Sequence, residues 1–127
     1  MRLDIFISTE VKSPKKRYGS YRAFWVGYSD TGKKLGEDGV INQQYGNEYG
    51  LLVLALKEAV GHINKNVRPE IRICCNNRVI LQSLKHLKSW EKTDFKKTNG
   101  QEVAYRDEWK YIASRLEGLI FRVEGGK

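Results

Sequence analysis

A long apolar segment with helical spacing, NEYGLLVLALKEAVGHIN (residues 47–64), separates three strand-like segments from a fourth. Its apolar residues recur every three or four positions, which predicts an amphipathic helix, and Asn47 stands where an N-cap is expected. The strand-like run PEIRICC (69–75) follows it. A crossover through a helix joins parallel strands and is right-handed. The chain is therefore expected to build an α/β sheet with at least one parallel pair.

The segments before this helix predict an antiparallel meander. Residues 2–8 (RLDIFIS) alternate in polarity, residues 20–29 (SYRAFWVGYS) are rich in aromatics, and residues 33–43 form a weaker third run. The DTG at 30–32 is a turn signal between the second and third runs. This pattern predicts three consecutive strands that form a meander.

The segments after residue 75 predict two helices and a last strand. Residues 77–90 have apolar residues at helical spacing, residues 103–116 are amphipathic, and residues 118–124 (GLIFRVE) read as a strand. The whole order is three strands, helix, strand, two helices and strand, with no internal repeat and no linker. A chain of 127 residues is long enough for one core and too short for two, so residues 1–127 are expected to form a single domain.

The formal net charge of +8 is concentrated in two segments. Residues 12–22 hold five basic residues and no acid, interleaved with Tyr18 and Tyr21, and residues 85–97 hold five lysines against two acids, with Trp90 and Phe95. Basic segments that also carry aromatic side chains suit a nucleic-acid backbone. The alternative is an ordinary solvated surface, and the interleaved aromatics favour nucleic acid.

Cysteine use and hydropathy indicate a cytoplasmic protein. Cys74 and Cys75 are adjacent and point to opposite faces of an extended segment, so they do not readily bridge each other and are expected to be reduced. These two thiols and the distant His62 and His86 do not make a zinc site. No apolar run is long enough for a bilayer span, and MRLDIFISTE is a poor signal peptide. We expect no metal and no cofactor.

The run SWEKTDFKKTNGQEVAYRDEW (89–109) resembles the basic handle of the handle-bearing, type I ribonuclease H family. The stretches LDIFIS, NEYGLLVLALKEA and IRICCNNRVI resemble that family's first strand, first helix and fourth strand. This resemblance implies a ribonuclease H-like α/β fold, with a five-stranded mixed sheet and helices on both faces. The family's histidine-bearing loop and last helix would lie beyond Lys127, so the C-terminal helix is expected to be missing.

The resemblance places three of the family's metal-binding acids on residues that are not acids. The aspartate that closes the first strand falls on Ser8, the glutamate of the first helix on Gly50, and the aspartate after the fourth strand on Asn76. The family hydrolyses a phosphodiester with two Mg²⁺ ions about 4 Å apart, and these repel by roughly 16 kcal/mol at an effective dielectric of 20. Carboxylates must offset this repulsion, so the resemblance implies a domain without that activity.

Other acids near these positions leave an alternative open. Glu10 lies two residues beyond Ser8, and Glu124 ends the last predicted strand, so a metal-dependent ribonuclease built on these displaced acids is a rival interpretation. Glu48 precedes Gly50 by two residues, which is about 200° around a helix. The change Gly50→Glu is expected to stabilise the helix, since glycine inside a helix is unfavourable.

The leading hypothesis is a catalytically inactive domain that binds nucleic acid, either an RNA/DNA hybrid or double-stranded RNA. The resemblance places Asn47 on an asparagine that touches the duplex backbone, with the small polar Asn77 beside it. The remaining candidate contacts lie in the handle: Trp90, Lys92, Phe95, Lys96 and Lys97. For Trp90, packing in the core is an equally good interpretation.

A protein-interaction scaffold is a second alternative. If the family's last helix is missing, an apolar strip of the sheet is uncovered, and a protein partner or a second copy of the chain would be expected to cover it.

Overall fold

The computed structural model describes residues 1–64 and 66–125. The observed element order is the predicted one. In chain order the elements are β1 (Arg2–Thr9), β2 (Arg17–Tyr28), β3 (Lys34–Gly46), α1 (Glu48–Val60), β4 (Glu70–Cys75), α2 (Arg78–Lys92), α3 (Arg106–Leu116) and β5 (Phe121–Gly125).

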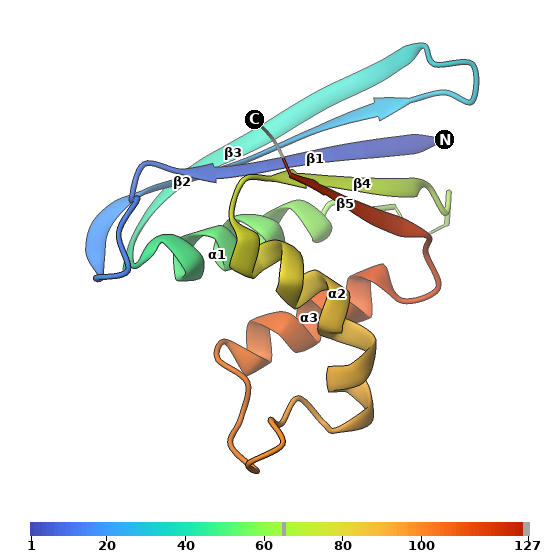
Figure 1. Cartoon of the computed structure of the whole chain (residues 1–127). Helices are drawn as coiled ribbons and strands as arrows, with labels where there is room; N and C mark the ends of the chain where they lie inside the picture. The colour runs from blue at the N-terminus through green and yellow to red at the C-terminus, as the bar shows by residue number, and fades with distance from the viewer. Residues whose placement is uncertain (65, 126–127) are drawn as a thin grey trace.

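The five strands form one mixed sheet in the order β3-β2-β1-β4-β5 (Figure 1). β1 pairs with β2 and β2 with β3 in antiparallel register, which confirms the meander. β1 pairs with β4 in parallel, with Phe6 opposite Cys74, and β4 pairs with β5 in parallel. The parallel pair expected from the first crossover is therefore the central pair of the sheet.

Helix α1 lies between the sheet and α3, which explains why it is apolar on nearly all sides. It packs against β1, β2 and β3 on one side and against α3 on the other. A helix buried all round needs apolar residues all round. Those that it buries are Gly50, Leu51, Leu52, Val53, Ala55, Leu56, Ala59 and Val60. No helix in residues 1–64 and 66–125 combines the length and the apolar character that a membrane crossing needs.

All three described helices lie on one face of the sheet (Figure 1), which differs from the expectation of helices on both faces. The reason is the direction of the crossovers. The connection from β3 to β4 and the connection from β4 to β5 both move across the sheet in the same direction. Right-handed crossovers that move in one direction place their helices on the same face.

The opposite face, which we call the open sheet face, carries an ion-pair network around one buried carboxylate. Asp4 on β1 is only 1% exposed, and its carboxylate accepts a hydrogen bond of 2.7 Å from Arg72 on β4. Arg72 also donates to Glu124 on β5 at 2.8 Å, and Arg2 lies 3.1 Å from Asp4. The Asp4 carboxylate raises the pKa of Arg72. This network ties the three parallel strands together without a helix above them.

The three helices are joined by a chain of buried hydrogen bonds. The indole Nε1 of Trp109 on α3 donates to the Tyr49 hydroxyl on α1 at 2.9 Å, and that hydroxyl lies 3.0 Å from Ser83 Oγ on α2. Because the Ser83 hydroxyl donates to the Val79 carbonyl at 2.8 Å, Tyr49 must be the donor to Ser83. Burial raises the pKa of Tyr49 above its usual 10.0, which keeps the phenol neutral and able to donate.

We expect Tyr49→Phe to lower the free energy of unfolding by about 1–3 kcal/mol, because it leaves the fully buried Trp109 N–H without an acceptor. Urea unfolding followed by tryptophan fluorescence measures the change. Tyr18→Phe is the control, since Tyr18 is 69% exposed, and it should change stability by no more than about 0.5 kcal/mol. Equal effects of the two variants would show that the hydrogen-bond chain does not stabilise the helices.

Candidate functional site

The carboxyl ends of β1 and β4 bring Ser8 and Asn76, two of the three positions at which the resemblance expects metal-binding acids, to the same edge of the sheet. Phe6 lies opposite Cys74 in parallel register, so Ser8 and Asn76 are each two residues further along adjacent strands. Both side chains are exposed. Open α/β sheets place their sites at this edge. The structure thus brings Ser8 and Asn76 level with each other, as the sequence predicted.

The start of α1 is attached to the basic loop that joins β1 to β2. Asn47 caps α1, accepting a 2.8 Å hydrogen bond from the Gly50 N–H, and its Nδ2 donates to the Pro14 carbonyl at 3.3 Å. The Glu48 N–H donates to the Ser13 carbonyl at 3.0 Å. Asn47 is therefore both the predicted N-cap and the anchor of this loop, which Figure 1 shows beside the start of α1.

Charged side chains near the end of β4 influence the pKa of the Cys75 thiol. Burial raises its pKa, the Asn77 N–H donates to its sulfur at 3.4 Å, and the charges of Glu48 and Lys12 act on it in opposite directions. Glu48 at the start of α1 and Lys12 in the basic loop therefore lie in the neighbourhood of the end of β4. Glu48 lies close enough to this edge to influence it, although Gly50 holds the position that resembles the catalytic glutamate.

Tyr105 occupies the space into which a side chain at position 50 would extend. A Cβ added to Gly50 would lie 2.7 Å from the Tyr105 ring carbon Cζ, and even closer to its hydroxyl oxygen. Tyr105 precedes α3 in a left-handed conformation with φ of 59°, and its ring contacts Tyr49 edge-on at 5.7 Å. The expectation that Gly50→Glu stabilises the helix is therefore wrong, because the new side chain collides with this ring.

No pattern in the sequence indicated that Tyr105 lies near the start of α1, beside the candidate site. It lies within the run that resembles the handle, 55 positions after Gly50, and only the packing of α3 on α1 brings the two together. A glycine in the first turn of a helix was the available signal, since a missing side chain there indicates the close approach of another group.

The displaced acids do not assemble into a metal site. The Glu10 carboxylate accepts a 2.8 Å hydrogen bond from the Ser20 N–H, and Glu124 pairs with Arg72. By register Glu124 lies two strands and four residues away from Glu10, about 16 Å at the usual strand spacing. Among the described residues no group of three or more histidine, cysteine, aspartate or glutamate side chains is arranged to hold a metal ion.

The handle is a short hairpin, residues 95–103, that projects from the end of α2. An isolated bridge between Lys96 and Glu102 closes it, and the Lys97 N–H donates to the Gln101 carbonyl at 2.7 Å. Gly100 turns the chain with φ of 84°, a conformation that favours glycine. Lys92, Lys96 and Lys97 are all exposed. Figure 1 shows the hairpin beyond the helices, on the side away from the sheet.

The handle aromatics form the base of the hairpin. Phe95 is only 5% exposed and contacts Trp90 at 6.4 Å between ring centroids, and Trp90 contacts Trp109 at 5.9 Å. Phe95 is one of the predicted nucleic-acid contacts, and its packing against the core leaves little of its ring accessible to a ligand. Trp90 is half-buried and joins the core through one edge.

Asn77 is placed as predicted, after β4 and at the start of α2. It is the N-cap of α2, where its side chain accepts a 3.0 Å hydrogen bond from the Ile80 N–H. The side-chain oxygen of Asn77 is thereby engaged, and Asn77 is half-buried directly after the exposed Asn76.

No protein-family model matches the chain, and no curated protein sequence matches it. Among solved structures it is similar to LC9-RNase H1, a type 1 RNase H with the type 2 active-site motif, at 12% identity and a TM-score of 0.73. The match covers 98% of this chain and 62% of LC9-RNase H1, so the chain spans less than two thirds of that protein.

Two further solved structures have the same architecture. RNase H1 from the halophilic archaeon Halobacterium salinarum NRC-1 matches at 13% identity and a TM-score of 0.62, over 99% of this chain and 86% of that one. The foamy viral protease-reverse transcriptase in complex with an RNA/DNA hybrid matches at 15% identity and a TM-score of 0.69, over 97% of this chain and 17% of that one.

These likenesses define the class of fold. At 12–15% identity the agreement is one of backbone arrangement, and it extends over nearly all of the described chain. The chain has a ribonuclease H-like fold, as its sequence predicted.

The contact between Gly50 and Tyr105 is testable by a double-mutant cycle. In the natural background Gly50→Ala should destabilise the protein, because its Cβ collides with the ring. In a Tyr105→Ala background the same change should be neutral or stabilise by up to about 1 kcal/mol, since alanine is the better helix former. Urea unfolding of all four proteins gives the coupling, and additive effects would show that the ring does not fill this space.

Proposed function

We propose that this chain is a degenerate member of the handle-bearing ribonuclease H family, and that it binds nucleic acid without cleaving it. The observation that carries the proposal is the handle: exposed Lys92 at the end of α2, and exposed Lys96 and Lys97 on the hairpin that follows, whose base is fixed by packed aromatic rings. A solved structure with the same fold is bound to an RNA/DNA hybrid.

The lysines bind phosphates and the fold reads the shape of the duplex. Each lysine that neutralises a phosphate releases a bound counterion, which contributes affinity that falls with salt. The hairpin is ordered by its own hydrogen bonds before any ligand arrives. Contacts with phosphates do not distinguish one base sequence from another. An RNA/DNA hybrid or double-stranded RNA is therefore recognised by its backbone.

The degenerate edge contributes a second, neutral contact. A hydroxyl at Ser8 and amides at Asn76 and Asn77 can hydrogen-bond phosphate oxygens, whereas three carboxylates would repel them in the absence of metal. The loop attached to Asn47 adds cations beside this edge, among them Lys12.

Cleavage by the family's two-metal chemistry requires charged ligands at this edge. Ser8 and Asn76 supply none, and the space at Gly50 is filled by Tyr105. We therefore propose that the domain holds its ligand intact. We also place it in the cytoplasm, on the basis of its adjacent free thiols.

A protein-interaction scaffold is the second candidate, and the open sheet face favours it. Phe6 is 38% exposed and Ile41 is 59% exposed, and Phe24 stands beside Phe6 with ring centroids 6.0 Å apart. These side chains form an apolar strip that a partner or a second copy would cover. Binding through such a strip is not weakened by salt, which separates it from phosphate binding.

Changing Lys92, Lys96 and Lys97 together to alanine should weaken the binding of an RNA/DNA hybrid. The slope of log affinity against log salt should flatten by up to about three units, because each lysine accounts for about one phosphate. Fluorescence anisotropy with a labelled hybrid at several salt concentrations gives both quantities.

A matched control changes the same number of lysines elsewhere. Lys33, Lys34 and Lys57 are exposed and lie outside the handle, so their triple alanine variant has the same net charge. This control variant should retain most of the slope of log affinity against log salt. If the two triple variants behave alike, the handle is not the binding surface.

The purified protein should leave a labelled hybrid intact in Mg²⁺ and in Mn²⁺, because the carboxylates that would hold the ions are absent from positions 8, 50 and 76. Denaturing electrophoresis of the hybrid measures this. Cleavage that disappears in Glu10→Gln or Glu124→Gln would contradict the proposal and favour the displaced acids.

A further inference from the structure

β5 is an edge strand of the sheet. Every second residue of β5 therefore has backbone N–H and C=O groups that do not bond to β4. The Ile71 N–H on β4 donates to the Ile120 carbonyl at 2.9 Å, just before β5 begins. In a parallel ladder alternate residues bond to the neighbouring strand. The peptide groups of Phe121 and Val123 therefore point away from β4, and no described strand pairs with that side.

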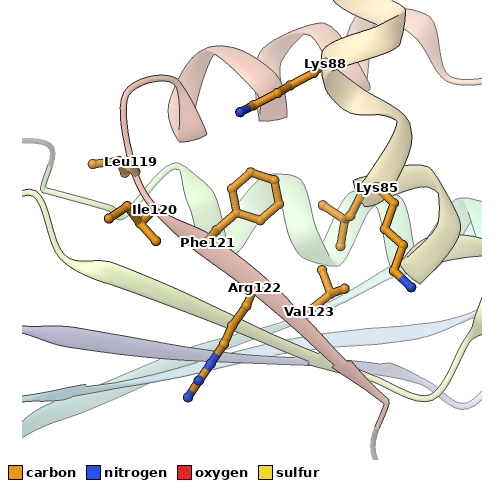
Figure 2. Close-up of a pocket in the computed structure, with 8 residues that line it drawn as sticks. Lys85, Lys88, Leu119, Ile120, Phe121, Arg122 and Val123 are labelled. Carbon is orange, nitrogen blue, oxygen red and sulfur yellow. The ribbon is translucent and has the colours of Figure 1, made fainter.

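A hollow of about 420 Å³ runs along this edge, between β5 and α2 (Figure 2). Leu119 to Val123 line it in succession from both faces of the strand, and Leu84 lines it from α2. Figure 2 shows the Phe121 ring extending from the strand toward α2, with Val123 beside it. Ile120 is 74% exposed, the most exposed large apolar side chain of the described chain. The floor is apolar and lies beside unused backbone donors and acceptors.

The rim of this hollow is basic. Lys85 and Lys88 on α2 lie on one side and Arg122 on the other, and no acidic side chain lines it. Arg122 makes only a loose pair, with its Nε 3.6 Å from Glu124. A second hollow of about 480 Å³ continues beyond Lys88 and Phe121 along α2 toward α3, and it includes the acids Glu91 and Glu117. The cationic stretch is therefore the one that follows β5.

We propose that the free edge of β5 binds an extended, acidic segment of a partner protein as a sixth strand of the sheet. The segment hydrogen-bonds the outward peptide groups of Phe121 and Val123. Alternate side chains of an added strand point to the same face, so apolar residues at alternate positions fill the hollow against Leu84 and Phe121. Acidic residues of the segment meet Lys85, Lys88 and Arg122.

Two other occupants fit this edge less well. A second copy paired through β5 would bring the same three cations face to face, which costs free energy in a chain of net charge +8. A nucleic acid would satisfy the cations, but it would leave the apolar floor and the outward N–H and C=O groups without matching partners. Of the three occupants, only the acidic peptide pairs with the cations, covers the apolar floor and hydrogen-bonds the free backbone groups of β5.

Selection of displayed random nonapeptides on the immobilised full chain tests the proposal directly. We expect enrichment of peptides with aliphatic residues at alternate positions and two or more acids. A synthetic peptide of the consensus, fluorescently labelled, then gives an affinity by anisotropy. Hydrogen exchange of the Phe121 and Val123 amides should slow at least tenfold when this peptide is bound at saturation.

Two variants with matched controls locate the site. Val123→Pro removes an outward N–H without removing a bond to β4, whereas Val123→Ala keeps it, so affinity should fall at least tenfold in the first and less than threefold in the second. The double change Lys85→Glu and Lys88→Glu keeps the edge intact and should also weaken binding at least tenfold. Lys33→Glu with Lys57→Glu, equal in charge, should leave it within twofold.

The proposal is overturned if no peptide is enriched, or if the selected peptide binds all these variants equally. It is also overturned if the double change at Lys85 and Lys88 weakens the binding of a labelled RNA/DNA hybrid while the peptide affinity stays the same, since the lysines then belong to a nucleic-acid surface. Loss of peptide binding with hybrid binding intact supports it. This result does not depend on the handle, so the two proposals fail or hold separately.

Discussion

The parallel pairing of β1 with β4 is the constraint on which the rest of the structure depends. To bring β4 beside β1, the chain must cross over the meander, and α1 is the segment that crosses. Right-handedness then fixes the face on which α1 lies, and the next crossover puts α2 and α3 on the same face. As a result α1 is enclosed between sheet and helix, and its start is hydrogen-bonded to the loop that follows β1.

The edge of the sheet where β1 and β4 end brings together polar side chains that are not acids. Ser8 and Asn76 end adjacent parallel strands, and the first turn of α1 stands beside them, held by Asn47. The place of a third side chain is taken by Tyr105. This edge therefore carries hydroxyl and amide groups, and no metal-binding cluster of acids is found there among the described residues, which suits the contact with an anion that we propose.

Helix α2 links the two surfaces that we propose for binding. Its last turn leads into the handle hairpin, and its lysines in the preceding turns face β5. The buried hydrogen bonds from Trp109 through Tyr49 to Ser83 fix α2 against α1 and α3. Both surfaces are therefore held on one rigid element, so neither needs a large rearrangement to form.

Local pattern was enough to predict most of the fold. Alternation in residues 2–8, helical spacing in residues 47–64 and the turn at 30–32 are properties of neighbouring residues, so the element order, the meander and the parallel crossover followed from them. The placement of Ser8 and Asn76 where two strands end was predictable for the same reason, whereas their comparison with metal-binding acids came from the resemblance and stays a prediction. Asn47 and Asn77 were placed correctly at helix starts, where asparagine satisfies free backbone N–H groups.

What the sequence alone determined is the succession of elements and the presence of two residues that are not acids, Ser8 and Asn76, where two strands end. Contacts between distant segments were decided only by the tertiary structure. Three contacts are examples. Position 50 collides with Tyr105, Phe95 is buried in the base of the handle, and Arg72 pairs with Glu124. No local pattern encodes these contacts, since each arises when packing brings two separately formed elements together.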